Sequence, residues 1–436
     1  MNDHRPDQVR DTIRCYVNGK RHEIRGADAF LPLTTWLRDV QGLTGTKVVC
    51  AEGDCGACCV LLGKPGASGM SYRPVCGCIQ YMFQLDLSHL VTVEGLSVAG
   101  APNPVQEAMI TCHGAQCGFC TPGIVVALYG LLTENPKATD DQIRRGLVGN
   151  LCRCTGYEPI LRAASEADRR KILPLPTIYE EQKILADLAC YAGEAVEIRN
   201  GGQVIHKPAT LEDAIAYRGR NPGCLVVAGG TDLGVRVNKG MRAFDHVLYI
   251  ADLHELTQLS LDDQSMIVGG AVSLSDLETA TRTTLPEFAQ LLDWFGSPPI
   301  RNAGTLGGNI VNGSPIGDTM PGLMVLGAEV ELRGPRGVRW VDLNAFYTGY
   351  RQSVLRPDEL LTRVRIPVPH ASEYFRVYKV SKRKDLDIST FMAAFLVRLE
   401  AGVVEEIRVA YGGVGPTIVR LCATEARLRG RHWDES

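Results

Sequence analysis

Alternating and helical spacings of apolar residues predict short strands and helices near the start of the chain. In "IRCYVNGKRHEI", residues 13–24, apolar and polar positions alternate on both sides of an Asn-Gly pair, which predicts a β-hairpin. The helical spacing of "PLTTWLRDV", residues 32–40, and the apolar run "CVLL", residues 59–62, predict a helix and a buried strand. Strand, strand, helix and a cysteine-rich loop therefore follow in order.

Later segments continue this mixture of helices and strands. Residues 123–136, "GIVVALYGLLTENP", and 139–150, "TDDQIRRGLVGN", have helical periodicity, and Thr139 with Gln142 resembles a capping box. The stretches "CLVVA", "FMAAFLVRL" and "EEIRVAYGGVGP" predict strands. The pattern predicts an α+β protein.

Three cysteines stand close together in the loop "CAEGDCGACCV". Cys50, Cys55 and Cys58 have the C-x4-C-x2-C spacing with which plant-type ferredoxins hold three corners of a [2Fe-2S] cluster. A loop around a cluster must aim backbone N–H groups inward, and Gly53 and Gly56 permit the turns that this requires. A zinc site or a set of core cysteines is the less favoured alternative.

The fourth ligand is ambiguous from spacing alone. Cys76 and Cys78 stand together in "PVCGCIQ", and Cys59 directly follows Cys58. Adjacent ligands strain the chain, so Cys59 is expected to be a buried strand residue. Cys76 and Cys78 both remain open at this point.

A second group of cysteines follows, at the ends of predicted helices. Cys117 and Cys120 form C-x2-C, and Cys152 and Cys154 form C-x-C, with both pairs expected at helix ends in a small helical bundle. In isolation this set could bind zinc, but C-x-C is an unusual zinc pair.

Composition adds limits to this picture. A chain of 436 residues suggests about three domains, and 45% hydrophobic with 22% charged residues is ordinary for a globular protein. A net charge of -3 gives no reason to expect nucleic acid or an acidic membrane as partner. The N-terminus lacks a signal-peptide pattern and no apolar run could span a membrane, so we expect a cytoplasmic protein. Fifteen cysteines in a reducing compartment favour metal or redox chemistry.

The cysteine motifs together resemble those of a known family. "CAEGDCGAC", "QCGFCTPG" and "NLCRCTGY", in this order, are similar to the two iron–sulfur domains of the molybdenum hydroxylases, which include xanthine dehydrogenase, aldehyde oxidase and carbon monoxide dehydrogenase. The resemblance implies a β-grasp [2Fe-2S] ferredoxin domain and a helical-bundle [2Fe-2S] domain. It favours Cys78, which lies where related sequences place their ligand relative to the later "TVEG", and leaves Cys112 outside the pattern. The implied ligands are Cys50, Cys55, Cys58 and Cys78 for one cluster and Cys117, Cys120, Cys152 and Cys154 for the other.

Two glycine-rich turns lie further along the chain. After "RRKILPLPTIYEEQ", which predicts an exposed linker, the strand "CLVVA" leads into Gly-Gly-Thr-Asp, and a second such turn spans residues 304–309. Bare backbone N–H groups can surround a phosphate at such turns, although Gly-Gly-Thr-Asp is not the Rossmann pattern.

The two turns resemble those of the family's FAD domain, which is of the vanillyl-alcohol-oxidase type. The resemblance implies that Phe295 packs on the isoalloxazine, Asp318 bonds a hydroxyl, and Leu361 and Lys379 border the flavin. The alternatives are a core Phe295 and Leu361, a solvated Lys379 and ordinary β-turns. The residues implied to embrace the pyrophosphate are Val226, Val227, Ala228, Gly229, Gly230, Thr231, Asp232, Leu233, Gly304, Thr305, Leu306, Gly307, Gly308 and Asn309.

The end of the chain resembles the start of the family's small C-terminal flavoprotein domain. It stops at "GRHWDES", about where that domain would still have helix to come, so we expect a truncated or reduced α+β domain. The predicted domains are a ferredoxin domain at 1–95, a helical [2Fe-2S] domain at 96–175, a linker at 176–200, an FAD-binding domain at 201–371 and the C-terminal domain at 372–436.

The resemblance also implies a function. Nothing in the chain resembles the large molybdopterin-binding domain, and two iron–sulfur domains joined to FAD resemble the small subunit of bacterial xanthine dehydrogenase. We therefore expect an electron-transfer subunit that passes electrons from a molybdopterin partner subunit, through two [2Fe-2S] clusters, to FAD and on to NAD+. The second cluster should face molybdenum and the first the flavin, in an (αβ)2 heterotetramer that contains no hydroxylation residue on this chain.

Two alternatives remain open. The same role is possible in a hydroxylase of another heterocycle, an aldehyde or an aromatic thioester, or the chain is a non-catalytic iron–sulfur and flavin carrier or sensor. For the acceptor, "FYTGYRQSVLRPDELL" resembles the segment that lines the nicotinamide side of the flavin in dehydrogenase members. It places Tyr350 near the ring, where an aromatic can stack on nicotinamide; an ordinary half-buried tyrosine is the alternative.

Overall fold

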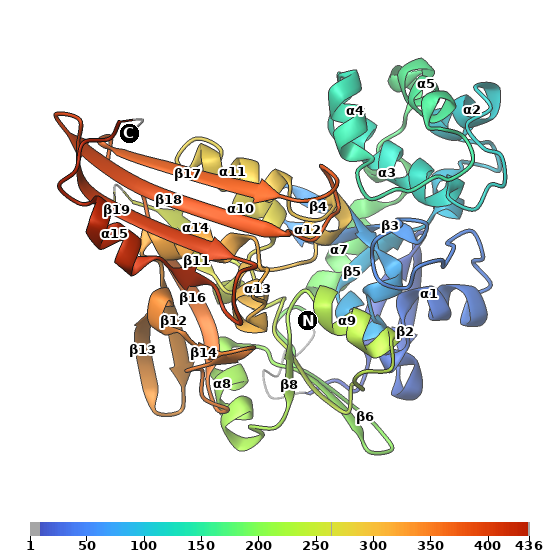
Figure 1. Ribbon diagram of the computed structural model, residues 1–436. Helices are drawn as coiled ribbons and strands as arrows, with labels where there is room; N and C mark the ends of the chain where they lie inside the picture. The colour runs from blue at the N-terminus through green and yellow to red at the C-terminus, as the bar shows by residue number, and fades with distance from the viewer. Residues whose placement is uncertain (1–8, 263, 435–436) are drawn as a thin grey trace. The chain divides into compact units, whose positions relative to one another are not determined.

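The computed structural model describes residues 9–262 and 264–434, which form two compact units (Figure 1). Of the described residues, the first unit comprises 9–209, 230–249 and 297–303, and the second comprises 210–229, 250–262, 264–296 and 304–434. No helix in the described part of the chain is long and apolar enough to cross a membrane.

The first unit begins with a five-stranded sheet of order β2-β1-β5-β3-β4. Asn18 and Gly19 both have positive φ, 47° and 78°, as a tight turn between β1 and β2 requires, so the predicted hairpin is confirmed. Cys59 is buried and starts β3, also as predicted. The elements are β1 (Ile13–Val17), β2 (Lys20–Ile24), α1 (Leu33–Thr35) with the π-helical turn η2 (Trp36–Val40), β3 (Cys59–Gly66), β4 (Gly69–Cys76), the turns η3 (Gly77–Ile79) and η4 (Met82–Leu85), and β5 (Ser88–Val91).

Four helices follow and share one apolar core. They are α2 (Pro104–Thr111), α3 (Thr121–Glu134), α4 (Asp140–Gly146) and α5 (Glu158–Glu166). Thr139 and Gln142 form the predicted reciprocal capping box at the start of α4, and Asn103 caps α2 in the same way. The helical periodicity read from the sequence is confirmed here.

The stretch expected to be an exposed linker is instead folded. It contains α6 (Leu175–Ile178), α7 (Glu181–Ala189) and β6 (Val196–Asn200). Ile184 and Leu188 lie one helical turn apart on α7 and are buried with Met70 of β4. An apolar face this short is too weak a pattern to predict this packing, which the neighbouring sheet supplies.

The first unit also takes three stretches from the predicted FAD domain, residues 201–209, 230–249 and 297–303. β7 (Gln203–Lys207) pairs with β6 on one side and with β9 (His246–Tyr249) on the other. The helices α9 (Thr231–Asn238) and α12 (Pro298–Arg301) belong to this unit as well. The exact domain limits stay a prediction.

The second unit is built around a five-stranded sheet of order β10-β11-β16-β12-β13. Its core is formed by this sheet, the helices and the inner face of the C-terminal strands. The elements are α8 (Leu211–Arg220), β8 (Leu225–Val227), β10 (Leu259–Leu261), β11 (Ser265–Gly269), α10 (Leu274–Thr281), α11 (Pro286–Asp293), α13 (Leu306–Asn312), α14 (Thr319–Leu326), β12 (Glu329–Gly334), β13 (Gly337–Asp342), β14 (Tyr347–Gly349), β15 (Gln352–Ser353) and β16 (Leu360–Pro367).

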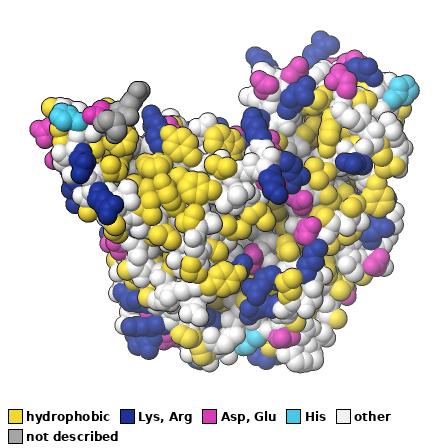
Figure 2. Space-filling view, in the orientation of Figure 1, with side chains coloured by type: hydrophobic (Ala, Val, Ile, Leu, Met, Phe, Trp, Pro, Cys, Tyr) yellow, Lys and Arg dark blue, Asp and Glu magenta, His cyan; other side chains and the backbone are white. Residues whose placement is uncertain are grey.

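The C-terminal strands form a separate antiparallel sheet of order β17-β18-β19-β20. Figure 2 shows hydrophobic side chains gathered over this sheet, where Tyr378 packs edge-on against Phe395 and Phe391 against Tyr411. The predicted strands are therefore present. The elements are β17 (Glu373–Val380), β18 (Phe391–Glu400), β19 (Val403–Gly412), β20 (Val419–Arg420) and α15 (Cys422–Leu428).

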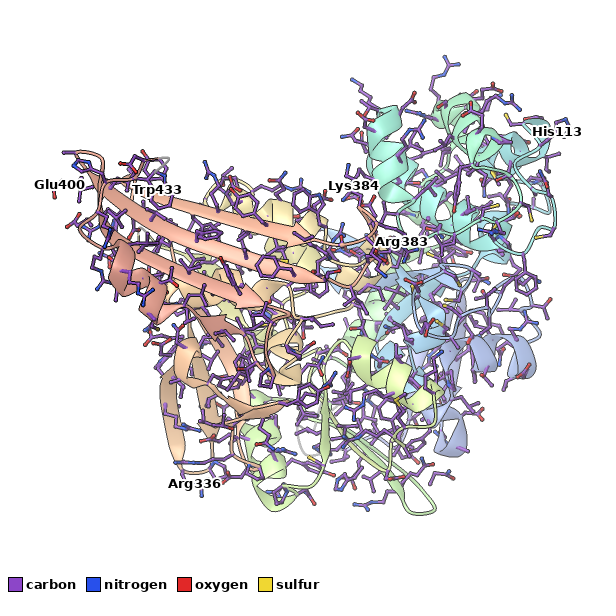
Figure 3. The ribbon with its side chains drawn as sticks, in the orientation of Figure 1. His113, Arg336, Arg383, Lys384, Glu400 and Trp433 are labelled. Atoms are coloured by element: carbon purple, nitrogen blue, oxygen red, sulfur yellow. The ribbon has the colours of Figure 1, made fainter. Side chains whose placement is uncertain are left out.

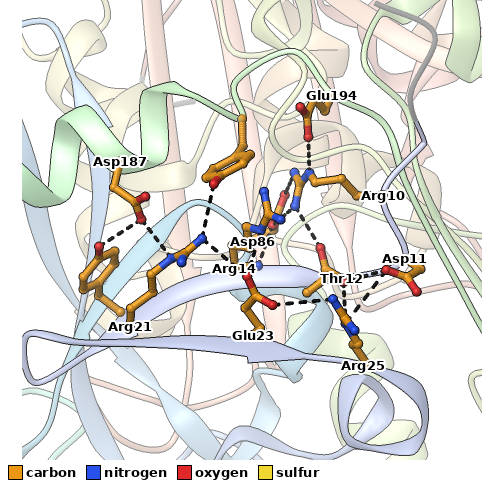
Figure 4. A network of polar contacts seen from close by, with 12 residues as sticks. Arg10, Asp11, Thr12, Arg14, Arg21, Glu23, Arg25, Asp86, Asp187 and Glu194 are labelled. Carbon is orange, nitrogen blue, oxygen red and sulfur yellow. Dashed lines mark hydrogen bonds and ion pairs between the residues drawn. The ribbon is translucent and has the colours of Figure 1, made fainter. Parts of the chain in front are cut away.

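A buried carboxylate joins separate parts of the first unit (Figure 4). Asp86 is fully buried and accepts two hydrogen bonds of 3.0 Å from the Arg10 guanidinium, and its Oδ2 lies 2.8 Å from Lys207 Nζ on β7. Burial alone would raise the pKa of Asp86, but the cations of Lys207 and Arg10 hold that pKa well below its usual value. The Asp86 carboxylate is therefore shared by two buried cations, of which Arg10 also pairs with Glu194 at 2.7 Å.

Replacing Asp86 by Asn should destabilise the first unit strongly. Asp86→Asn removes the buried negative charge that Lys207 and Arg10 share. Arg10 keeps its ion pair with Glu194, but breaking a buried ion pair costs about 3–5 kcal/mol. We expect the first unfolding transition of the full chain to fall by about 6–12 °C in calorimetry at pH 7. The stabilisation by Asp86 is present above the ordinary pKa of 3.8 and is lost as the pH falls below it.

Glu23→Gln is the control. It removes a more exposed carboxylate that pairs with Arg14, Arg21 and Arg25, and should shift the transition by about 2 °C or less; a shift equal to that of Asp86→Asn would contradict the prediction.

Candidate functional site

The first set of thiols lies on a loop with unusual backbone geometry. Cys50, Cys55 and Cys58 lie between η2 and β3, and Cys78 lies in the turn η3. Ala51, Gly53 and Gly56 all have positive φ, at 56°, 78° and 66°, which wraps the loop tightly. The spacing predicted such a loop, and the structure brings its three cysteines to Cys78.

Hydrogen bonds link these thiols in a series. Cys50 bonds with Cys55 and with Cys78, and Cys78 also bonds with Cys58. Cys76 bonds with Cys58 at the end of the series and also donates from Sγ to the Gly53 carbonyl at 3.3 Å. Cys78 thus lies between two other candidate ligands, which favours it over Cys76 as the fourth.

The second set of thiols lies at the ends of helices. Cys120 is the N-cap residue of α3, and Cys152 and Cys154 lie between α4 and α5. The sulfurs of Cys117 and Cys154 are 3.5 Å apart, and Cys120 and Cys152 hydrogen-bond each other. Two thiol pairs therefore come together, with Cys117 and Cys154 exposed to solvent.

The loops that carry the two thiol sets are in direct contact. The Leu151 N–H donates to the Cys55 carbonyl at 2.9 Å, and Asn150 Nδ2 donates to the Gly56 carbonyl at 3.2 Å. A Cβ added to Gly56 would lie 2.1 Å from the Gly149 oxygen, and one added to Gly123 would lie 2.0 Å from the Gly56 oxygen. Glycine is required here because backbone meets backbone.

The thiols of the first set have pKa values shifted in opposite directions. Hydrogen bonds from Cys55 and Cys78 lower the pKa of Cys50, whereas hydrogen bonding to Cys50 and burial raise the pKa of Cys55. Within residues 9–262 and 264–434, no group of three or more His, Cys, Asp or Glu side chains is arranged around a single metal ion. The thiols form a hydrogen-bonded series in the first set and two pairs in the second, and binding of a metal cluster would displace their protons.

The first glycine turn leads from a strand into a helix. β8 is followed by Gly230, which has φ of 74° and is the N-cap residue of α9. No side chain of the described residues caps this helix. The first N–H groups of a helix without a side-chain cap can receive a phosphate, so this turn fits the predicted role.

In the second glycine turn, several backbone N–H groups already donate hydrogen bonds within the protein, which its sequence did not suggest. Thr305 caps α13 by accepting from Gly308 N–H, and the Leu306 and Gly307 N–H groups donate to the Val272 and Gly270 carbonyls. An added Cβ on Gly307 would lie 2.5 Å from the Gly270 oxygen. Internal packing therefore explains part of its glycine content.

Asp318 and Lys379 form a buried ion pair with an O–N distance of 2.7 Å. Lys379 Nζ also donates to the Trp294 carbonyl, next to Phe295, and Ser389 donates to Asp318 at 2.5 Å. Lys379 is 4% exposed, so the solvated alternative is wrong.

Two other predicted flavin residues lie in the packed interior of the second unit. The loop that carries Ser389 is charged. Leu361 is buried in the core on β16, and Phe295 packs against that core. Ser389 belongs to the connection between β17 and β18, which also carries Arg383 and Lys384 (Figure 3).

Tyr350 is at the tip of the β14–β15 hairpin and is 60% exposed, so the half-buried alternative is wrong. The hairpin is fastened to α13 because the Tyr347 hydroxyl donates to the Ile310 carbonyl at 2.9 Å and Arg351 donates to Asn312 Oδ1 at 2.8 Å. Tyr350 is thus held at the far end of the helix that starts at the second glycine turn.

Models of three protein domains match successive parts of the chain. Residues 92–165 match a [2Fe-2S] binding domain, 197–369 match the FAD binding domain in molybdopterin dehydrogenase, and 376–436 match the CO dehydrogenase flavoprotein C-terminal domain. These are domains of the molybdenum hydroxylases, to parts of which the chain is homologous. The predicted fold class, with iron–sulfur, FAD-binding and C-terminal flavoprotein domains, is confirmed.

Full-length relatives in this family are longer than the chain. It is 29% identical to the xanthine dehydrogenase/oxidase of Gallus gallus, over 99% of this chain and 37% of that protein. It is 30% identical to the xanthine dehydrogenase of Emericella nidulans, over 98% of this chain and 35% of that protein. The chain therefore corresponds to just over a third of these molybdenum hydroxylases.

Solved structures of the family resemble part of the chain. A carbon monoxide dehydrogenase from Hydrogenophaga pseudoflava matches with a TM-score of 0.51 and 27% identity, over 53% of this chain and 81% of that chain. The enzyme from Oligotropha carboxidovorans matches with a TM-score of 0.50 and 26% identity, over 53% of this chain and 82% of that chain.

Two residues that contact the predicted sites were not identified from the sequence. Ser389 reaches Asp318 across 71 positions, and Asn238 reaches Ala51 across 187 positions. Neither lies in a recognisable spacing pattern, so no signal in a single sequence could have found them.

Single substitutions of Cys78 and Cys76 should show which of the two is the fourth cluster ligand. Cys78→Ser removes the thiol that hydrogen-bonds with both Cys50 and Cys58, so we expect the ferredoxin-type EPR signal of the iron-loaded chain to be abolished or altered. Cys76→Ser is the matched control and should leave the signal in place. The reverse pattern would make Cys76 the ligand.

Proposed function

We propose that the chain is the electron-transfer subunit of a xanthine dehydrogenase. In this proposal a partner subunit carries the molybdopterin and oxidises the substrate, and this chain passes the electrons to FAD and NAD+. The observation that carries the proposal is the assembly of two thiol sets on touching loops, joined in one chain to an FAD-binding domain.

The thiol sets fit two [2Fe-2S] clusters. Such a cluster takes four cysteine ligands, and each set supplies four: Cys50, Cys55, Cys58 and Cys78 in one, and Cys117, Cys120, Cys152 and Cys154 in the other. When bound, the clusters accept and give single electrons, and FAD exchanges electron pairs as hydride with a nicotinamide. The residues of this chain hold the groups, orient them and set the surrounding charge.

The FAD region fits a flavin with its phosphates at the start of α9. The N-terminus of this helix at Gly230 is uncapped by side chains of the described residues. In the second unit, the buried Lys379 and Asp318 offer a fixed cation and a fixed acceptor beside Phe295. In this proposal Asp318 bonds a hydroxyl of the flavin, and Lys379 borders the flavin.

The second thiol set is placed to meet a partner subunit. Cys117 and Cys154 are exposed, and the apolar side chains of Phe119 and Leu151 beside them are 47% and 40% exposed. Exposed apolar residues around a redox centre suit burial against another protein. We propose that this face meets the molybdopterin subunit, in an (αβ)2 heterotetramer located in the cytoplasm.

Xanthine is the proposed substrate because the full-length relatives that match nearly the whole chain are xanthine dehydrogenases. A role with another heterocycle or an aldehyde is the alternative, since the substrate would bind to the partner. The mass of the partner that copurifies with the chain, with metal and flavin analysis of the complex, tests both.

The cofactor content should follow the thiol and glycine sites. We expect about four iron atoms and one non-covalently bound FAD per chain, because eight cysteines come together in two sets of four and no His or Cys lies in the flavin loops. Iron and acid-labile sulfide analysis with flavin release by acid measures this. Half that iron in a fully loaded preparation, or zinc in its place, would contradict the two-cluster assignment.

Tyr350 should contribute to NADH binding. An exposed aromatic on a fixed hairpin can stack on nicotinamide, so Tyr350→Ala should raise KM for NADH several-fold in dye reduction by the FAD-loaded chain. Dye reduction by chemically reduced flavin should change little, and no purine should be hydroxylated by this chain alone.

The control for that variant is Tyr374→Ala, which removes a tyrosine of similar exposure from β17. It should leave the KM for NADH unchanged. An unchanged KM in Tyr350→Ala, or a wild-type chain that holds FAD yet takes no electrons from NADH, would favour oxygen or a protein as the acceptor.

A further inference from the structure

The last residue of α9 contacts both segments that carry the first thiol set. Asn238 Nδ2 donates to the carbonyl oxygens of Ala51 at 2.9 Å and Cys78 at 2.8 Å, and Asn238 Oδ1 accepts from the Tyr81 hydroxyl at 2.9 Å. A primary amide has two N–H donors and one carbonyl acceptor, so each part of this side chain has a partner.

The two carbonyls that Asn238 joins are next to candidate ligands. Ala51 follows Cys50 and has φ of 56°, which is uncommon for a residue with a side chain. The thiols of Cys50 and Cys78 hydrogen-bond each other. By holding the peptide groups beside them, the amide fixes the distance between these two thiols.

The helix α9 also packs closely against the turn η3, which contains Cys78. A Cβ added to Gly234 of α9 would lie 2.8 Å from the Ile79 carbonyl oxygen. The middle of α9 therefore packs directly against the residue that follows Cys78. The same helix starts at Gly230 in the first predicted flavin turn, so it connects that turn with the first thiol set.

We propose that Asn238 is a positioning residue for the first [2Fe-2S] cluster. It keeps Cys50 and Cys78 at the spacing at which both bind the same cluster, and so sets the environment on which the cluster potential depends. This inference rests on the proposed function, because it requires a cluster on the first thiol set.

The neighbouring residue provides a matched control. Lys239 Nζ lies 2.9 Å from a carboxylate oxygen of Glu52, and both side chains of this ion pair are more than a third exposed. Glu52 belongs to the loop segment between Cys50 and Cys55. An exposed ion pair contributes little to stability. Lys239→Ala therefore removes a contact between the end of α9 and the cysteine loop without affecting the amide.

The test is the EPR spectrum and iron release of the iron-loaded full chain. Asn238→Ala leaves two backbone carbonyls without donors, so the ferredoxin-type signal should shift and broaden, and its iron should pass to a chelator about tenfold faster. The signal of the second cluster should stay unchanged. Lys239→Ala should keep both signals and iron release within about twofold of the wild-type chain.

A second measurement excludes a general loss of folding. In hydrogen exchange, residues 50–56 should exchange faster in Asn238→Ala, and residues 117–122 should not. Equal acceleration in both loops, or an unchanged first signal in Asn238→Ala, would overturn this inference and leave the eight-cysteine assignment intact. A wild-type chain that holds no iron–sulfur cluster would overturn the proposed function and this inference together.

Discussion

The contact between backbones at Gly56, Gly123 and Gly149 is the constraint on which the arrangement of the two thiol sets depends. A side chain at Gly56 or Gly123 would place a carbon within about 2 Å of a carbonyl oxygen, far inside the van der Waals limit. The hydrogen bond from Leu151 to Cys55 closes the same contact. Close packing of the two backbones and this hydrogen bond therefore fix the distance between the two sets.

The first unit combines elements that are distant in sequence around this contact. The Asp86 carboxylate ties Arg10 and Lys207 to the first sheet, and α7 covers β4 with Ile184 and Leu188. Ile300 of α12 and Val235 of α9 pack beside the buried thiols of the first set. The region matched by the FAD-binding domain thus contributes directly to the environment of the first thiol set.

The second unit holds its polar groups by close packing. Gly307 packs on Gly270, and Gly270 in turn on the Leu361 carbonyl, which brings α13 against the sheet. The buried pair of Asp318 and Lys379 is satisfied by Ser389 and the Trp294 carbonyl. Buried charges persist where such partners complete their hydrogen bonds, so the pair gives a rigid polar feature beside Phe295.

The sequence by itself determined the features that depend on local spacing. The hairpin at Asn18 and Gly19, the capping box of α4 and the strand that begins at Cys59 follow from neighbours in the chain, because turn geometry and helical caps involve residues a few positions apart. The cysteine motifs also indicated the family, since metal ligands recur at short fixed spacings.

The tertiary structure alone decided which distant groups meet. It folded the expected linker as α7, buried Lys379 beside Asp318, left Tyr350 exposed, and brought Asn238 to Ala51 and Cys78. These outcomes depend on partners many positions away, and a single sequence has no local pattern that records them. The free energy of burying a charge or an amide is set by the partner it finds, and that partner exists only once the chain has folded.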